Sequence, residues 1–405
     1  MKHYSQVAVE RTMKIQEVIL RAMAKKITWW QAAEIIGISC RQMRRWRERY
    51  EQYGYDGLFD RRRGKPSPKR VPLETVEEVL RLYQELYFDF NTRHFHEKLR
   101  EEHSICLSYT WVKSALQGAG LVKKARRRTP HRKRRERRPL PGMLLHIDGS
   151  HHQWFQDERW YDLISILDDA TSQVYYAQLV EEEATRTVMV AIRAVIEEKG
   201  LFCALYSDRA SHFFLTPKAG AKVDKERLTQ VGRALRELGI EPIPAYSPQA
   251  RGRSERAFRT WQGRLPQELR LRGITTVKEA NSFLLDSYLT EFNEKFSVAA
   301  RERGTAFVRC RRTDLDLVFS LQHERVVARD NTVSFGNRTL QIEQPKWRSS
   351  LAGCRVVVYE HLDATISVGY GPHIVGHYTA EGLALMPAKE RGRKKPVVVP
   401  RTYAA

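Results

Sequence analysis

Three acidic residues stand where their carboxylates could act together. Asp148 ends one apolar run, Asp208 follows another, and Glu255 lies in a stretch with helical spacing. Three carboxylates at one point repel each other unless cations neutralise them, and oxygen-rich sites suit Mg²⁺ or Mn²⁺. Two such ions about 4 Å apart could activate an attacking oxygen and stabilise the leaving oxygen of a phosphodiester. Any one of these acids could be a surface or capping residue, but the set favours a site for two metal ions.

The elements that would position these acids are predicted by the apolar pattern between residues 141 and 300. Short apolar runs predict five strands: 143–148, 161–168, 173–180, 202–206 and 240–244. Apolar residues at helical spacing predict four helices: 184–199, 225–238, 248–265 and 277–296. The first three strands are spaced as an antiparallel meander, and helices then alternate with strands. This order predicts an α/β core in which helices pack over a mixed sheet.

A helix-turn-helix pattern occupies residues 27–50. Thr28 and Ser39 can each cap a helix, and Gly37 stands between them where a tight turn needs positive φ. Polar side chains cover most of the second helix: Arg41, Gln42, Arg44, Arg45 and Arg47. We expect this helix to enter the major groove of DNA, where guanidinium groups bind guanine edges or phosphates. The alternative is a solvated basic helix in an ordinary bundle.

Two further domains are expected, one on each side of the core. Apolar stripes over residues 73–123 predict a second, winged-helix-type DNA-binding module, in which Ser108 caps the last helix. After Phe307, short strands separated by turns predict a small β-barrel. These strands are 326–328, 332–335, 339–342, 354–359 and 364–368.

We therefore expect a multidomain chain with N-terminal all-α helix-turn-helix modules, a central α/β core and a C-terminal small β-barrel. The expected segments are a helix-turn-helix domain at 1–52, a basic linker at 53–71, a second helix-turn-helix or winged-helix-like domain at 72–123, a basic linker at 124–140, the catalytic core at 141–300, the β-barrel domain at 301–386 and a basic tail at 387–405.

The net charge of +22 is unevenly distributed along the chain. Residues 1–140 carry 33 Lys and Arg against 16 Asp and Glu, residues 141–300 carry 20 against 22, and residues 301–405 carry 17 against 10. Such basic ends predict binding to a polyanion, because each neutralised phosphate releases counterions. The run 123–138 contains 11 Lys and Arg; it fits a linker that follows the DNA backbone, and a nuclear-localisation signal is the alternative.

Composition excludes several other classes of protein. No apolar run approaches the roughly 20 residues of a membrane-spanning helix, and the first residues lack the apolar region of a secretion signal. The five cysteines form no C-x-x-C pair, so neither a disulfide framework nor a zinc ribbon is expected. We expect a cytoplasmic protein without a membrane partner.

Three stretches around the acids resemble the catalytic motifs of DDE transposases and retroviral-type integrases. They are Leu145-His-Ile-Asp148, Tyr206-Ser-Asp208-Arg-Ala-Ser-His-Phe213 and Tyr246-Ser-Pro-Gln-Ala-Arg-Gly-Arg-Ser-Glu255-Arg-Ala-Phe. The resemblance covers about residues 140–300, and the Ser-Pro-Gln stretch is its most specific part. The double helix-turn-helix start and the small β domain also resemble bacterial insertion-sequence transposases, among them the group labelled ISNCY.

The resemblance implies an RNase H-like integrase core in which Asp148, Asp208 and Glu255 are catalytic and bind two Mg²⁺ or Mn²⁺ ions. It implies a transposase that binds double-stranded DNA at the terminal repeats of an element and performs cleavage and strand transfer into target DNA by direct transesterification. We expect a homo-oligomer on DNA, associated with the nucleoid. Further DNA contacts are expected from the arginines around Glu255: Arg251, Arg253, Arg256 and Arg259. The alternative is a DNA-binding regulator with an inactive integrase-like core.

The chain departs from compact integrases in its spacing. Asp208 and Glu255 are 47 residues apart, and residues 214–227 look like an insertion before the second core helix. Retroviral integrases also carry an N-terminal His/Cys zinc module, and the sequence contains none.

Smaller polar clusters near the acids have simpler interpretations. His146, His151 and His152 surround Asp148 and make an alternative metal site that we consider weak. Residues 181–183 are three glutamates that suit the start of a helix. Asp168 and Asp169 stand at a strand end and are expected to form the turn.

Overall fold

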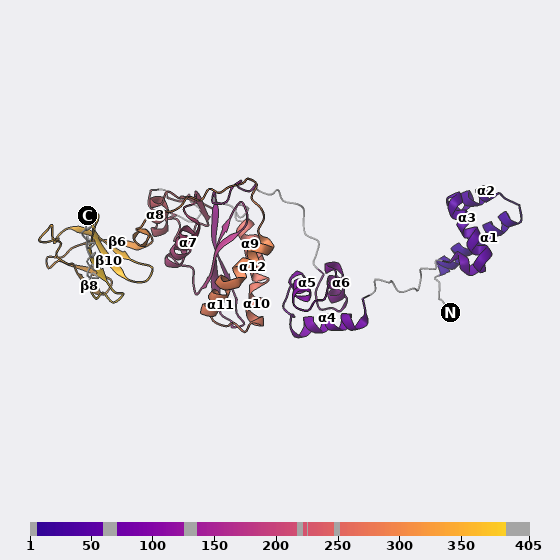
Figure 1. The fold of residues 1–405 in the computed structure, drawn as a ribbon, viewed down its shortest axis with the longest axis horizontal. Helices are drawn as coiled ribbons and strands as arrows, with labels where there is room; N and C mark the ends of the chain where they lie inside the picture. The colour runs from indigo at the N-terminus through magenta and orange to yellow at the C-terminus, as the bar shows by residue number, and fades with distance from the viewer. Residues whose placement is uncertain are drawn as a thin grey trace, which may run out of the picture. The chain divides into compact units, whose positions relative to one another are not determined.

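The computed structural model describes residues 6–59, 71–124, 136–216, 222–224, 226–246 and 252–385. The chain separates into two compact units, Met1–Val79 and Leu80–Ala405, whose elements are labelled in Figure 1. Most of the two predicted basic linkers and the whole predicted tail lie outside the described residues. Within the described part, no helix is long and apolar enough to cross a membrane.

The first unit contains the predicted helix-turn-helix. Its elements are α1 (Gln6–Met23), α2 (Trp29–Ile36), α3 (Cys40–Tyr53) and η1 (Gly54–Leu58). The Thr28 hydroxyl accepts the Gln31 N–H at the start of α2, and the Ser39 hydroxyl accepts the Gln42 N–H at the start of α3. Gly37 ends α2 with φ of 75°, a conformation that a residue with a Cβ rarely adopts. These caps confirm the predicted helix starts and the turn between them.

The second predicted module consists of three helices. They are α4 (Leu73–Glu85), α5 (Thr92–Glu101) and α6 (Tyr109–Gly118). Asn91 caps α5, and Ser108 caps α6 as predicted. Aromatic and aliphatic side chains fill the space between the helices, including Tyr87, Phe95 and Leu116. Residues 71–124 contain no strand, and the winged form of this module stays a prediction.

The core sheet has five strands in the order β3-β2-β1-β4-β5. Their bounds are β1 (Leu145–His152), β2 (Tyr161–Asp168), β3 (Val174–Val180), β4 (Ala204–Ser207) and β5 (Glu241–Pro244). Strands β1, β2 and β3 pair antiparallel, whereas β4 pairs parallel with both β1 and β5. The predicted meander, the mixed sheet and the predicted succession of strands and helices along the chain are therefore confirmed.

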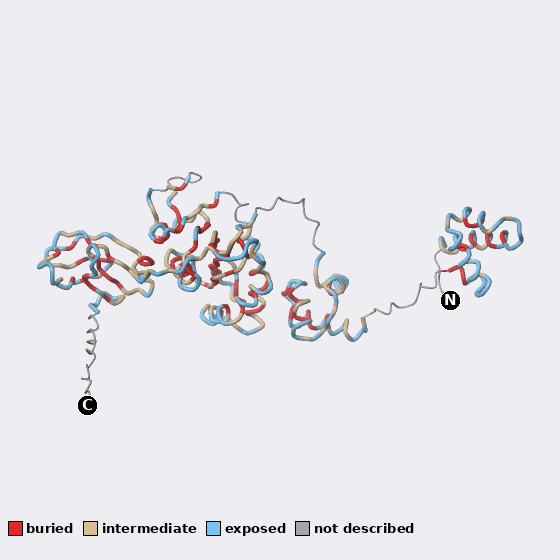
Figure 2. Tube along the Cα trace, turned by 45° about the horizontal axis from the view of Figure 1, so that its top comes forward, coloured by how far each residue is buried: buried red, intermediate tan, exposed pale blue. Residues whose placement is uncertain are grey.

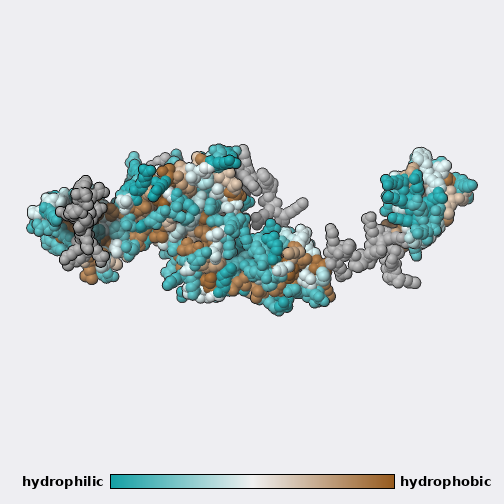
Figure 3. All heavy atoms as spheres, viewed as in Figure 1, coloured by the Kyte–Doolittle hydropathy of each residue, from teal (hydrophilic) through white to brown (hydrophobic). Residues whose placement is uncertain are grey.

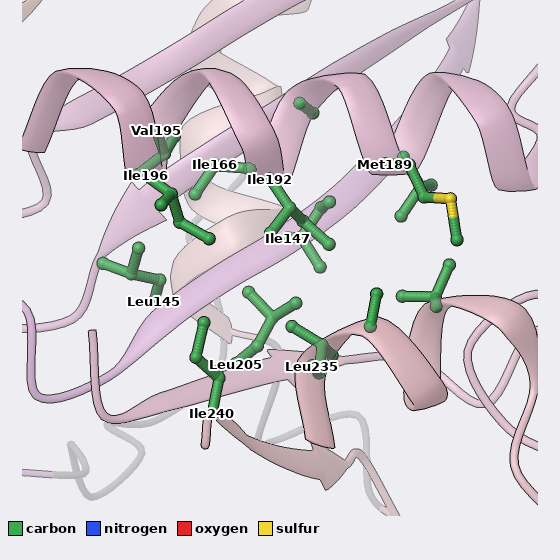
Figure 4. Packing of buried hydrophobic residues seen from close by; sticks show 14 of the residues in the cluster. Leu145, Ile147, Ile166, Met189, Ile192, Val195, Ile196, Leu205, Leu235 and Ile240 are labelled. Carbon is green, nitrogen blue, oxygen red and sulfur yellow. The ribbon is translucent and has the colours of Figure 1, made fainter. Parts of the chain in front are cut away.

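Helices cover both faces of this sheet (Figure 1). On one face lie α7 (Thr185–Lys199) and α8 (Gln230–Glu237). Figure 4 shows Ile192, Val195 and Ile196 of α7 directed at the strand that carries Leu145 and Ile147. On the other face lie α9 (Gly252–Gln262), α10 (Leu265–Leu271), α11 (Val277–Phe283), η3 (Leu284–Tyr288) and α12 (Leu289–Phe296). Figure 2 shows that buried residues concentrate between these layers.

Two predicted helices on the second face are subdivided. The helix expected at 248–265 ends at Gln262, and α10 begins anew with Pro266 in its first turn, where proline is tolerated. The helix expected at 277–296 contains the π-helical segment η3. Its buried residues Ala280, Leu284, Tyr288 and Phe292 are four apart, a spacing that overruns the 3.6-residue α-turn. The wider π turn keeps this stripe directed at the core.

The C-terminal region contains two small sheets around one core. Helix α13 (Leu315–Val318) precedes the strands β6 (Leu321–Val326), β7 (Thr332–Phe335), β8 (Arg338–Gln341), β9 (Arg355–Glu360), β10 (Ile366–Tyr370) and β11 (His373–Tyr378). Four strands pair in the order β11-β10-β9-β6, and β7 pairs with β8. Val333 and Leu340 of the hairpin pack with Val356, Val358 and Val368 of the larger sheet. The described strands form no closed barrel, so the predicted barrel stays a prediction.

Candidate active site

Asp148 lies on the face of the sheet that α9 covers. Along β1, Leu145 and Ile147 point into the core beneath α7 and α8. Because successive strand residues point to opposite faces, His146, Asp148 and Ser150 point the other way. Asp148 is 6 % exposed.

Asp208 directly follows β4, the strand that pairs in parallel with the Asp148 strand. The pairing places His146 opposite Tyr206, and the two rings are 5.2 Å apart on one face. Neighbouring strands are about 4.8 Å apart, and the approach of the two carboxylates beyond these pairs stays a prediction. The Oδ1 atom of Asp208 accepts the Ala210 N–H at 3.0 Å.

Glu255 lies in the first turn of α9 and is exposed. Helix α9 packs on the same sheet face through Phe258 and Trp261, and Gln262 Nε2 donates to Ser150 Oγ at 2.9 Å. However, no three His, Cys, Asp or Glu side chains among the described residues form a group that could hold a metal ion. The structure therefore places Asp148 on β1, Asp208 directly after the neighbouring strand β4 and Glu255 on the covering helix, and the convergence of all three stays a prediction.

Asp169 links β1 to the start of α9. It is fully buried, and its Oδ1 atom lies 2.8 Å from His146 Nε2 and forms an ion pair with Arg253 Nη1. Its Oδ2 atom accepts the Arg138 N–H at 2.7 Å. Burial opposes ionisation, but the hydrogen bonds from His146, Arg138 and Arg253 outweigh it and hold the pKa of Asp169 well below its usual range. We call His146, Asp169 and Arg253 the Asp169 cluster.

Asp168 has the turn role that the sequence predicts. Its carboxylate accepts the backbone N–H groups of Gly142, Ala170 and Thr171. It is as deeply buried as Asp169, but the backbone bonds do not compensate fully, and burial raises its pKa. Sequence reasoning gave both acids the same role, whereas the structure separates a turn acid from an acid that joins two elements.

The three histidines near Asp148 do not share one face. His146 and His152 lie on one face of β1, and His151 lies on the other. The Nδ1 atom of His151 is 2.8 Å from Asp162 Oδ1. The alternative histidine metal site is therefore wrong. Glu183, one of the three glutamates expected at a helix start, precedes α7, and its Oε1 lies 2.9 Å from His212 Nε2. Its carboxylate fills the space that a side chain at Gly149 would need.

The predicted DNA-contact residues are mostly exposed. On α3, Arg41, Gln42, Arg44, Arg45 and Arg47 are all exposed. Arg47 also bonds Glu51 at 2.7 Å and lies over the Trp29 ring. Arg256 and Arg259 are exposed on α9, Arg253 is engaged by Asp169, and Arg251 lies outside the described residues. Hydrophilic residues cover much of the visible face of the first unit (Figure 3).

A second buried polar group joins α5 to α10. Glu268 lies on α10 with its side chain 5 % exposed; its carboxylate is 2.7 Å from His94 Nε2 and 2.9 Å from Lys98 Nζ, and also pairs with Arg272. Beside it, Arg264 forms a two-pronged pair with Glu97 at 2.7 and 3.0 Å. We call this contact the α5–α10 interface.

Two domain families match the N-terminal part of the chain. They are a helix-turn-helix domain over residues 16–66 and a homeodomain-like domain over residues 42–116. Both matches include α3, and they assign a DNA-binding architecture to this part.

Two curated proteins are similar over most of the chain. The chain is 31 % identical over 368 residues to y4bF of Sinorhizobium fredii, a protein predicted to be a transposase; the match covers 90 % of this chain and 80 % of that protein. It is 28 % identical over 387 residues to the transposase for insertion sequence IS1202 of Streptococcus pneumoniae, covering 86 % and 82 %. The chain belongs to the insertion-sequence transposase family.

Solved structures give a more distant likeness. A chain of the simian T-cell lymphotropic virus intasome in complex with PP2A regulatory subunit B56 gamma matches at 13 % identity and a TM-score of 0.31, covering 69 % of this chain and 91 % of that one. A chain of the Mos1 strand transfer complex matches at 16 % identity and a TM-score of 0.26, covering 73 % and 96 %. Family membership rests on the two relatives, not on these structures.

Proposed function

We propose that this transposase binds the terminal repeats of an insertion sequence, cleaves the element ends and joins them to target DNA. The observation that supports the catalytic part is the parallel pairing of β1 with β4, because Asp148 lies on β1, Asp208 directly follows β4 and the helix that bears Glu255 packs on the same sheet face. A DNA-binding regulator would not need a buried acid on β1 and a second acid at the end of the neighbouring strand. The exposed arginines of α3 support the DNA-binding part.

Asp148, Asp208 and Glu255 are the proposed ligands of two Mg²⁺ or Mn²⁺ ions. Carboxylate oxygens on neighbouring strands fit hard cations, and a buried carboxylate beside a second one is costly unless cations neutralise both. When bound, such ions stabilise charge on the attacking and leaving oxygens of a phosphodiester. Glu255 is exposed in the first turn of α9, so it is accessible to complete the set.

The proposed reaction has two displacements. A water oxygen attacks the phosphorus at the element end, the bond from phosphorus to the 3′ oxygen breaks, and the freed 3′-hydroxyl takes a proton. That 3′ oxygen then attacks a phosphorus in target DNA and displaces the target's own 3′ oxygen. In the first step a water oxygen replaces the 3′ oxygen on phosphorus, and in the second one 3′ oxygen replaces another. Both nucleophiles come from water or DNA, so no nucleophilic Ser, Tyr or Cys is required.

The assembly is part of the same proposal. We expect a homo-oligomer, because two element ends must be joined to one target, and an association with the nucleoid through DNA. We retain the segment boundaries expected from the sequence, including a barrel-like C-terminal domain at 301–386.

The test is cleavage and joining of a duplex that carries an element end. We expect Asp148→Asn, Asp208→Asn and Glu255→Gln each to lower both rates by about 10²–10³ or more, because each change removes a charge that stabilises the transition state. End binding, measured in parallel with EDTA present, should survive, since the changes are near-isosteric.

Glu182→Gln is the matched control, because Glu182 is an exposed acid of the same domain. It should keep substantial activity. Full joining by one of the three variants would remove that residue from the site, and activity in EDTA would discard the metal mechanism. A protein that binds ends but never cleaves would favour the regulator.

A further inference from the structure

Helix α9 is attached to β1 on both sides of Asp148. Towards one end of β1, His146 contacts Asp169, which also holds Arg253 in the first turn of α9. Towards the other end, Ser150 accepts a hydrogen bond from Gln262 in the last turn of α9. His146, Asp148 and Ser150 alternate along one face of one strand. Asp148 therefore lies between the two attachment points.

The attachment through the Asp169 cluster is the stronger of the two. Its contacts come from three separate parts of the chain, and Asp169 is fully buried. The Asp169 carbonyl oxygen also accepts from Arg253 Nη1 at 3.0 Å. Charge-assisted bonds are shorter and roughly twice as strong as neutral ones, whereas the Gln262–Ser150 bond is neutral.

We propose that Asp169 is a positioning residue that holds the Glu255 end of α9 against the Asp148 strand through Arg253 and His146. This inference rests on the proposed function of the three acids. Asp169 contacts the residue two positions before each of two proposed ligands. His146 precedes Asp148 on β1, and Arg253 precedes Glu255 on α9. Without its carboxylate, the first turn of α9 would lose the charge-assisted contact that links it to His146 on β1.

The expected effect follows from this geometry. Groups that orient metal ligands typically change metal affinity 10–100-fold when they are removed. Asp169→Asn keeps the size of the side chain but removes the charge that binds Arg253. We expect the half-saturating Mg²⁺ concentration to rise about tenfold or more, both in titration calorimetry of the protein alone and in end cleavage. End binding in EDTA should not change.

Asp168→Asn is the matched structural control. Asp168 is adjacent, equally buried and similarly bonded, but its partners are local backbone N–H groups. This variant should lower the melting temperature and leave the half-saturating Mg²⁺ concentration unchanged. Equal losses of melting temperature in both variants, with no change in metal affinity in either, would overturn the proposal.

Arg253→Gln tests the same attachment from the helix side. Arg253 is partly exposed, so its loss threatens folding less than a change at Asp169. We expect a similar rise in half-saturating Mg²⁺, and the double variant should be no worse than either single one, because both remove one interaction. Additive losses would show that the two residues act separately and would overturn the proposal.

The proposed function and this inference can fail separately. If Asp148→Asn abolishes cleavage while Asp169→Asn leaves the metal titration unchanged, only the inference is wrong. If Asp148→Asn cleaves normally, or if the unmodified protein binds no Mg²⁺ by calorimetry, the proposed function is wrong and the inference falls with it.

Discussion

Arg44 and Arg45 lie on the exposed surface of α3, the second helix of the helix-turn-helix. No ion pair involving either of them is recorded among the described residues, in contrast to Arg47, which bonds Glu51. Guanidinium groups on such a helix read guanine edges through paired hydrogen bonds. These two residues are therefore the best candidates for sequence recognition by this unit.

We expect Arg44→Ala or Arg45→Ala to weaken binding to the cognate end by about 1–3 kcal/mol relative to unrelated DNA, if the residue reads a base. Competition binding with cognate and scrambled duplexes measures this difference. Arg49→Ala is the control, because Arg49 is also exposed on α3 but lies further from its N-terminal end, where base contacts concentrate. It should weaken binding to both duplexes equally, and an equal loss for Arg44→Ala would assign Arg44 to the phosphate backbone.

For single residues, the sequence predicts the roles of those whose partners are close to them along the chain. Thr28, Ser39 and Ser108 cap helices within three residues of themselves, so their roles could be inferred locally. Asp169 could not be interpreted this way, because Arg253 is 84 positions distant along the chain and His146 is 23 distant. One signal was available: a histidine and an arginine stand two residues before two of the proposed ligands.

Among the elements, Glu268 of α10 dominates the α5–α10 interface. Burial opposes its ionisation, but hydrogen bonds and charge from His94 and Lys98 lower its pKa to about 2, from an ordinary value of 4.5. The folded state thus binds fewer protons than the unfolded state. Its contribution to stability is complete above pH 4.5 and is lost as pH falls towards 2. Burial also lowers the pKa of His94 below its ordinary value of 6.5. The unfolded chain therefore takes up a proton at His94 before the folded chain does, and a further loss of stability begins as pH falls below about 6.5.

We expect Glu268→Gln to lower the melting temperature at pH 7, since it removes the buried acid that pairs with His94 and Lys98 and leaves Lys98 paired with Glu102 alone. Breaking a buried pair costs up to about 3–5 kcal/mol. Between pH 5 and 3 the melting temperature of the variant should fall by fewer degrees than that of the unmodified chain. Thermal melts across this range measure both effects. Glu294→Gln, on an exposed position of α12, should follow the unmodified chain; parallel pH curves for all three proteins would contradict the role of Glu268.

The predicted elements were most accurate where the apolar pattern was strong. Strands β2 and β7 have the predicted bounds, and the order of the core is as predicted. Strand β6 was mostly missed, because Gln322, His323 and Glu324 give it no apolar alternation and its side chains are largely half-exposed. The break before α10 and the π turn depend on packing against the sheet. The spacing of apolar residues alone does not predict such packing.

For the whole molecule, the uneven charge determines how binding should respond to salt. The N-terminal 140 residues carry most of the net positive charge, and each phosphate they neutralise releases condensed counterions. We expect the fragment 1–140 to bind duplex DNA by itself, with log affinity falling linearly with log salt at a slope of about −0.9 per phosphate contact.

Fluorescence titrations at several salt concentrations measure this slope. The fragment 141–405, which is nearly neutral over the core, is the comparison and should give weaker binding with a smaller slope. Salt-independent binding by the N-terminal fragment, or none, would contradict the prediction. The charge pattern was readable from the sequence, but the attachment of the second module to the core was not, because its pairs join residues about 170 positions apart.

The α5–α10 interface limits how new specificities can be made by recombination. A second module transplanted from a relative would have to carry equivalents of His94, Lys98 and Glu97. Otherwise the host would keep Arg264 buried without its acid, and Glu268 would keep only Arg272. A graft that exchanges α10 together with the module keeps the pairs intact. In a lineage that evolves by swapping parts, α5 and α10 should therefore be inherited as one unit, although they are far apart in the gene.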